Sequence, residues 1–104
     1  MENAERILRS ASSAAPTIML GLAPVLDDEA IDERIKRLSR DLRVLGGDLG
    51  VPFLEIFSFV SECAAWRREA GRADGAHPNR EGYSALAEFI WDWPEFRRWI
   101  GADA

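Results

Sequence analysis

Residues 17–22 read TIMLGL, a continuous apolar run between Pro16 and the pair Ala23-Pro24. An apolar run of this length, bounded by turn residues, is typical of a strand that is covered on both faces, and such strands belong to parallel sheets. We therefore predict a strand over residues 17–22. A second short apolar segment, VPFLEI at residues 51–56, predicts another strand, with its proline near the start, where no ladder donor is lost.

The segment between these strands changes to a helical period. Six apolar residues alternate in steps of four and three, which places them on one stripe of a helix: Ile31, Ile35, Leu38, Leu42, Leu45 and Leu49. Asp27 or Asp28 is a suitable N-cap for this helix. Gly46-Gly47 frees the backbone to leave it. We predict a long helix that ends near these glycines.

Further helices are predicted on either side of this unit. Residues 2–14 show helical spacing up to Pro16, and residues 58–70 form a helix around Val60, Ala64 and Trp66. A loop over residues 71–78 follows. Asn79 caps a last long helix, and Pro94 restarts a terminal turn. The apolar residues expected to face inward from the last long helix are Tyr83, Leu86, Ala87 and Ile90, and the terminal turn carries Phe96, Trp99 and Ile100.

The order helix, strand, helix, strand, helix, helix is typical of an α/β layer fold with a right-handed crossover between parallel strands. We predict a single domain over residues 1–104, with two parallel strands and four to five helices. Two strands are too few for a parallel sheet, because their unpaired edges expose backbone donors and acceptors. The chain therefore adds further strands, pairs edge to edge with another copy, or is the C-terminal part of a larger α/β domain.

Composition excludes several classes of function. The chain has 13 Lys and Arg against 18 Asp and Glu, a net charge of −5, which argues against binding nucleic acid or an anionic membrane surface. Its single cysteine, Cys63, cannot form an intrachain disulfide, and we expect it to be a small, partly buried residue. The N-terminus is acidic and lacks an apolar run, and no apolar run is long enough to span a bilayer. We expect a cytoplasmic protein.

His77, the only histidine, lies in the glycine-containing loop, three residues after Asp74. A histidine held by a carboxylate at a loop mouth is a candidate general base, because the carboxylate fixes the tautomer and leaves the other ring nitrogen free to take a proton. The alternative is that both side chains only cap backbone groups. One histidine and one cysteine far apart in sequence do not form a metal site, and we expect neither a metal nor a cofactor.

The residues around this pair carry a family resemblance. DGAHPN at residues 74–79, followed by Gly82-Tyr83 and Leu86-Ala87, closely resembles the last conserved block of the SGNH hydrolases, also called the GDSL lipase/esterase family. The resemblance implies a three-layer, flavodoxin-like α/β/α fold and ester hydrolysis, with Asp74 and His77 as two members of a serine triad. It covers nearly the whole chain, but only the C-terminal half of the family domain.

The chain departs from the family at the nucleophile. The family's Gly-Asp-Ser block is missing, since the only Gly-Asp pair, Gly47-Asp48, is followed by Leu49, and its oxyanion donors have no counterpart. Seven serines lie in or beside predicted helices, without a glycine-flanked turn to expose a hydroxyl: Ser10, Ser12, Ser13, Ser39, Ser58, Ser61 and Ser84. We expect the isolated chain to be nearly inactive, with an ester as substrate only if missing sequence or another chain completes the site.

A non-enzymatic alternative is a truncated, inactive relative that associates with itself or with a partner. It predicts a homo-oligomer, formed through a strand edge or through the aromatic surface near the C-terminus. That surface consists of Trp91, Trp93, Phe96 and Trp99, interleaved with charged residues. These rings pack the terminal helix against the sheet, or they form an exposed patch for a partner.

Overall fold

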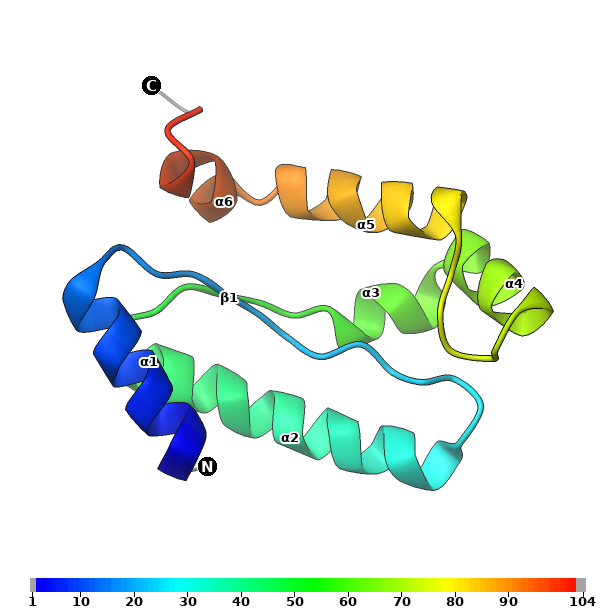
Figure 1. The fold of residues 1–104 in the computed structure, drawn as a ribbon, viewed down its shortest axis with the longest axis horizontal. Helices are drawn as coiled ribbons and strands as arrows, with labels where there is room; N and C mark the ends of the chain where they lie inside the picture. Colours follow the sequence, from blue (N-terminus) through cyan, green and yellow to red (C-terminus); the bar gives the residue numbers. More distant parts are fainter. Residues whose placement is uncertain (1, 103–104) are drawn as a thin grey trace.

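The computed structural model describes residues 2–102, and Met1, Asp103 and Ala104 lie outside the described range. Its elements are α1 (Glu2–Ala14), β1 (Met19–Leu20), α2 (Glu29–Asp48), β2 (Phe53–Leu54), α3 (Phe57–Glu62), α4 (Ala64–Arg72), α5 (Arg80–Trp91) and α6 (Pro94–Trp99). Figure 1 shows α5 and α6 on one side of the strands, with α1 and α2 on the other. The predicted alternation helix, strand, helix, strand, followed by helices, is confirmed, but the described residues form six helices rather than the four to five predicted, because the helix predicted over residues 58–70 is divided in two.

The two strands pair in parallel, as the sequence predicts, but each is only two residues long. Met19 lies opposite Phe53, and Leu20 lies opposite Leu54. The backbone pairing continues past the strand, because Gly21 N–H donates to the Leu54 carbonyl at 2.8 Å. A Cβ at Gly21 would lie 2.9 Å from the Phe53 ring and 3.2 Å from Ser39 Oγ, so the missing side chain allows β1 to lie close to α2.

The long helix α2 begins as predicted and ends later. Asp28 is its N-cap, and its carboxylate accepts a hydrogen bond from Ile31 N–H at 3.1 Å. The expected end at Gly46-Gly47 is wrong, because the helix continues to Asp48. Gly46 is buried, and a Cβ there would lie 3.1 Å from the Val51 carbonyl, so this glycine serves close packing against the chain that enters β2. The turn itself uses Gly50, with φ +69°.

The helix predicted over residues 58–70 is divided into α3 and α4. Cys63 between them has extended backbone angles (φ −79°, ψ 106°) and is half-buried against the core. On one continuous helix, Val60 and Trp66 would project about 120° apart. The break instead lets both enter one core, where they are 0% and 5% exposed. Ala64, which was expected inside, is exposed.

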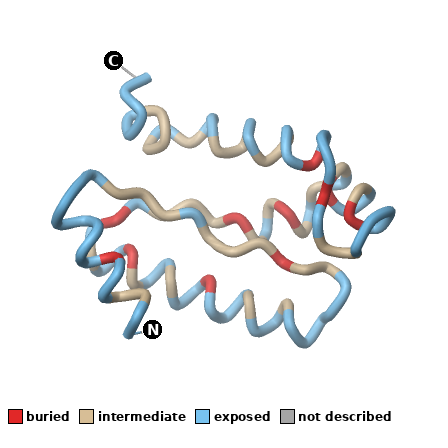
Figure 2. The backbone as a smooth tube through the Cα atoms, in the orientation of Figure 1, coloured by how far each residue is buried: buried red, intermediate tan, exposed pale blue. Residues whose placement is uncertain are grey.

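The main core lies where α3, α4 and α5 meet (Figure 2). Its buried residues are Ile56, Val60, Trp66 and Ala70. Leu86 and Phe89 of α5 pack against this cluster, and the Phe89 ring stacks on Phe59 with centroids 4.2 Å apart. The expectation that Tyr83 and Ala87 face inward is wrong, because both are exposed.

The C-terminal aromatic residues pack mainly on one another. The Phe96 ring packs against the rings of Trp91 and Trp99, with ring centroids 6.3 Å and 6.1 Å apart, respectively. Trp99 Nε1 donates to the Pro16 carbonyl at 3.0 Å and so ties α6 to the segment before β1. Trp91 and Trp99 stay about half exposed, and so does Ile100. Across residues 2–102, no helix is both long and apolar enough to cross a membrane.

Candidate functional site

The loop between α4 and α5 brings Asp74 and His77 together, as the sequence predicts. The His77 ring nitrogen Nδ1 lies 2.6 Å from Asp74 Oδ2. The other carboxylate oxygen, Oδ1, accepts from the backbone N–H of His77 at 2.7 Å and of Ala76 at 2.9 Å. One carboxylate therefore shapes the loop backbone and orients the imidazole at the same time.

The turn at Gly75 places this loop against the chain that follows β1. Gly75 has φ +86°, and its N–H donates to the Ala70 carbonyl at the end of α4 at 2.8 Å. A Cβ at this position would lie 2.8 Å from the Asp27 carboxylate. Asp27 follows β1 directly before α2, so the Asp74–His77 loop lies beyond the carboxyl end of the parallel strands. Ligand sites of open α/β sheets lie at that end.

Two contacts from α4 and α5 fix the loop to the core. Trp66 Nε1 donates to the Ala76 carbonyl at 3.4 Å. Pro78 is buried, and a Cβ at Gly82 would lie 2.4 Å from Pro78 Cβ and 3.0 Å from Trp66 Cα. The first turn of α5 therefore packs directly on the loop and on α4, and only glycine fits at position 82.

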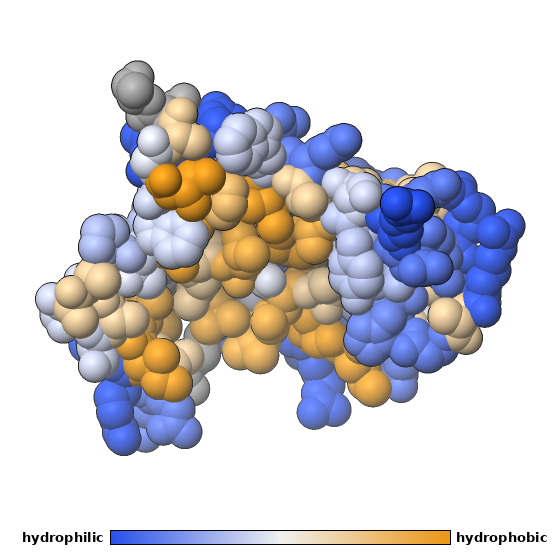
Figure 3. Space-filling model, turned by 45° about the horizontal axis from the view of Figure 1, so that its top comes forward, coloured by the Kyte–Doolittle hydropathy of each residue, from blue (hydrophilic) through white to orange (hydrophobic). Residues whose placement is uncertain are grey.

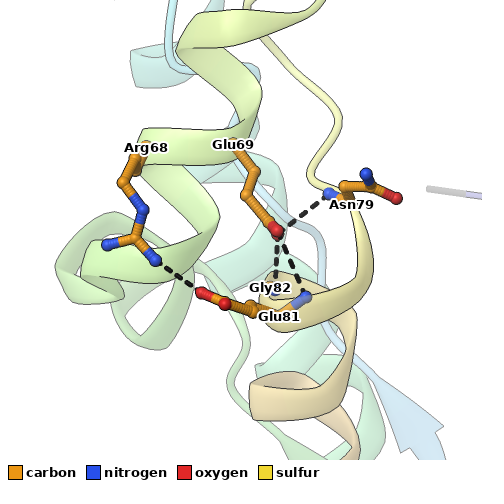
Figure 4. Close-up of polar contacts among 5 residues, drawn as sticks. All are labelled: Arg68, Glu69, Asn79, Glu81 and Gly82. Carbon is orange, nitrogen blue, oxygen red and sulfur yellow. Dashed lines mark hydrogen bonds and ion pairs between the residues drawn. The ribbon is translucent and has the colours of Figure 1, made fainter.

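The start of α5 is capped from α4 (Figure 4). Asn79 occupies the predicted N-cap position, but its side chain makes no capping bond. Glu69 takes this role: its Oε1 accepts from the backbone N–H of Asn79 at 3.0 Å and of Gly82 at 2.6 Å. Its Oε2 accepts from Glu81 N–H at 3.2 Å. Sequence reasoning missed Glu69, because a cap that lies ten or more residues upstream has no local pattern.

The electrostatics of the two carboxylates follow from these bonds. The backbone N–H groups of His77 and Ala76, and then the His77 ring, hold the pKa of the Asp74 carboxyl well below its usual range. Partial burial by itself would raise the pKa of Glu69, but its three backbone donors and Arg68 outweigh this effect and lower it. Because Asp74 is ionised, the His77 nitrogen that faces it carries the proton.

The remaining ring nitrogen of His77, Nε2, is available for chemistry. The His77 side chain is 72% exposed, and among residues 2–102 no serine hydroxyl is hydrogen-bonded to it. Ser12 and Ser13, for example, donate to carbonyls of their own helix. A cleft of about 1070 Å³ lies at the amino ends of the strands between α1 and α6, away from this loop. Within the described residues, the imidazole is therefore oriented by Asp74 and has no serine hydroxyl bonded to it.

Comparisons with protein-family models and with curated proteins return no match for this chain. Any functional assignment therefore depends on the geometry of the Asp74–His77 loop and on the sequence around it.

The depressed pKa of Asp74 predicts how the loop responds to acid. A group whose pKa is lowered by folding contributes stability that is fully present above its unfolded pKa of about 3.9 and is lost as the pH falls towards the folded value. We expect the Asp74 carboxyl carbon, followed by NMR, to begin titrating only below this unfolded pKa. In His77→Ala the pKa rises only part of the way, because the backbone donors remain. Titration of wild-type Asp74 near 3.9 would contradict the geometry.

Proposed function

We propose that Asp74 and His77 form the general-base half of an ester-hydrolysing site of the SGNH type, in a chain that corresponds to the C-terminal part of a flavodoxin-like α/β/α domain. The observation that carries this proposal is the 2.6 Å contact between His77 Nδ1 and Asp74 Oδ2, in a His77 side chain that is 72% exposed. Two further features support it: helices lie on both sides of a parallel strand pair, and the loop lies beyond the carboxyl ends of the strands.

The mechanism is acyl transfer. Nε2 of His77 takes the proton of a serine hydroxyl as the serine oxygen bonds to the ester carbonyl carbon. The imidazolium is stabilised by the Asp74 carboxylate and then gives its proton to the leaving alcohol, which produces an acyl-enzyme. A water molecule loses a proton to Nε2, attacks the acyl carbon and releases the acid. The proton then returns to the serine oxygen, and Asp74 stays ionised throughout.

The serine must come from outside the residues that contact His77. None of the described serines is hydrogen-bonded to the imidazole, so this proposal assigns the nucleophile and the oxyanion donors to further sequence or to another chain. Without them, the loop retains little of a triad's rate enhancement. Ester is therefore the substrate class of the completed site, while the chain by itself is expected to react slowly with activated esters only.

A second candidate is an inactive relative that functions through association. The same missing nucleophile favours it, together with the exposure of Trp91 and Trp99. Under this alternative, the Asp74–His77 contact serves to shape the loop before α5.

Activity towards p-nitrophenyl acetate separates the two. We expect release of p-nitrophenol that depends on His77, falling at least about tenfold in both His77→Ala and Asp74→Asn, because an oriented base is lost in each case. Glu88→Gln, an exposed change on α5, is the control and should not alter the rate.

Intact mass after treatment with a fluorophosphonate then reports whether the chain holds its own nucleophile. An adduct that is lost in His77→Ala would place a reactive serine within this sequence. If a folded chain gives neither an adduct nor His77-dependent hydrolysis, the proposal of an esterase site fails and the associating module remains.

A further inference from the structure

The molecule is a thin slab, and the unpaired edge of β1 lies on one of its two broad faces. Its principal extents are 42, 35 and 16 Å, and the short direction holds only two strands. In Figure 1, which looks along that direction, β1 passes in front of β2 and α1 lies in front of α2. The face towards the viewer is therefore the unpaired side of β1, together with the helices beside it.

This face carries exposed apolar side chains from both sides of the sheet. A Cβ at Gly21 would face α2, where it would lie close to Ser39. Side chains alternate between the two faces of a strand, so Leu20 points to the α5–α6 side, where it is 44% exposed. On α2, Ile31 and Leu38 form one row with Leu45 at steps of seven. Leu45 lies beside α1, but Ile31 and Leu38 extend past it and are 41% and 43% exposed. Figure 3 shows a continuous apolar area over the middle of the molecule, below the C-terminal helices.

The β1 edge also lacks one of the features that protect an exposed edge. Natural edges are guarded by charged residues. Residues 15–26 contain no charge, whereas the outer edge of β2 is followed by Glu55. Because Met19 and Gly21 bond to β2, the backbone groups of Ile18, Leu20 and Leu22 point the other way. Within residues 2–102 these three N–H groups have no partner strand.

The surface area indicates how much of the chain is uncovered. A compact monomer of 11.6 kDa exposes about 5,800 Å². This chain exposes 6909 Å², an excess of about 1,100 Å². One side of a specific protein interface buries about 800 Å², and stable dimers bury about 2,000 Å² or more in total. If each of two copies buries its excess surface against the other, the total buried area reaches the range of stable dimers.

We propose that the β1 edges of two copies of this chain pair antiparallel across a two-fold axis, which forms a continuous four-stranded sheet. The edge is self-complementary for this arrangement. An axis through Leu20 pairs Leu20 with its own symmetry mate and pairs Ile18 with Leu22 of the second copy, so all three outward backbone groups are satisfied. Isologous two-fold contacts of this kind are the commonest in homo-oligomers. His77 lies beyond the carboxyl end of the strand and is not part of this interface.

Sedimentation velocity of the full chain over micromolar concentrations tests this interface. We expect a dimer of twice the 11.6 kDa chain mass. Leu20→Lys places a charge on the edge, and Leu38→Glu places one on the exposed helical row. Each should weaken the dimer at least about tenfold. Trp91→Ser, on the competing aromatic surface, is the matched control and should leave the dimer intact. Circular dichroism confirms that each variant is folded.

Hydrogen exchange supplies a second measurement that does not depend on any variant. The N–H groups of Ile18, Leu20 and Leu22 should be protected at high protein concentration and exchange faster on dilution. A wild-type monomer at these concentrations would overturn the proposal. So would a dimer that is lost in Trp91→Ser and retained in both Leu20→Lys and Leu38→Glu, because that result would assign the interface to the aromatic surface.

Discussion

Trp66→Ala is expected to destabilise the chain by about 3–5 kcal/mol, the range for truncating a buried aromatic residue. Trp66 is 5% exposed and lies at the centre of the core formed by α3, α4 and α5. Its ring also meets Tyr83 edge-on at 5.5 Å. A domain of this size has a total stability of roughly 5–15 kcal/mol, so this single change removes a large part of it.

The same substitution should loosen the candidate site, because the Trp66 indole N–H holds the Ala76 carbonyl between Asp74 and His77. Urea unfolding gives the change in stability, and hydrogen exchange at Ala76 and His77 gives the effect on the loop. Trp91→Ala is the matched control, since Trp91 is 49% exposed and should have a much smaller effect. If the two variants lost the same amount of stability, Trp66 would not be the tryptophan that is buried in the core.

Gly82→Ala is the second substitution that we expect to destabilise the chain strongly. One added methyl group would lie 2.4 Å from Pro78 Cβ, 3.0 Å from Trp66 Cα and 3.0 Å from Glu69 Oε1, and two of these three neighbours cannot rotate away. Overpacking of this kind costs about 1–3 kcal/mol, and we expect the upper end of that range because α5 must separate from α4. The displacement would also break the bond from Gly82 N–H to Glu69.

The control for this glycine is Gly71→Ala. Gly71 is in α4, and a Cβ there has no atom within 4 Å, so alanine should stabilise the helix by about 0.5–1 kcal/mol. Thermal unfolding of the two variants should therefore shift in opposite directions. A harmless Gly82→Ala would show that α4 and α5 are not in close contact at the start of α5.

The candidate site divides into a part that could be predicted and a part that could not. Asp74 and His77 are three residues apart, and a loop of this length brings such a pair together by itself. The residues that hold the loop in place lie outside it. Glu69 and Trp66 of α4 and Gly82 of α5 reach the loop only because α4 packs on α5. No spacing in the sequence encodes that packing, so the roles of these three residues could not be predicted.

The fold divides in the same way. The hydrophobic periods of the sequence determined the alternation of helices and strands and the parallel pairing of Met19–Leu20 with Phe53–Leu54, which lie within the predicted segments 17–22 and 51–56. The sequence also limited the N-cap of α2 to Asp27 or Asp28, and the structure has Asp28 there. These features could be predicted because they depend on residues close together in the chain.

Only the tertiary structure decided where α2 ends and where the helix predicted over residues 58–70 breaks. It also decided which apolar residues are covered. Gly46 stays within α2 and packs closely against the chain that enters β2, and the break at Cys63 lets Val60 and Trp66 enter one core. Ile31 and Leu38 have the same period as Leu42 and yet stay exposed, because burial depends on which neighbour is present and the slab has none on that side.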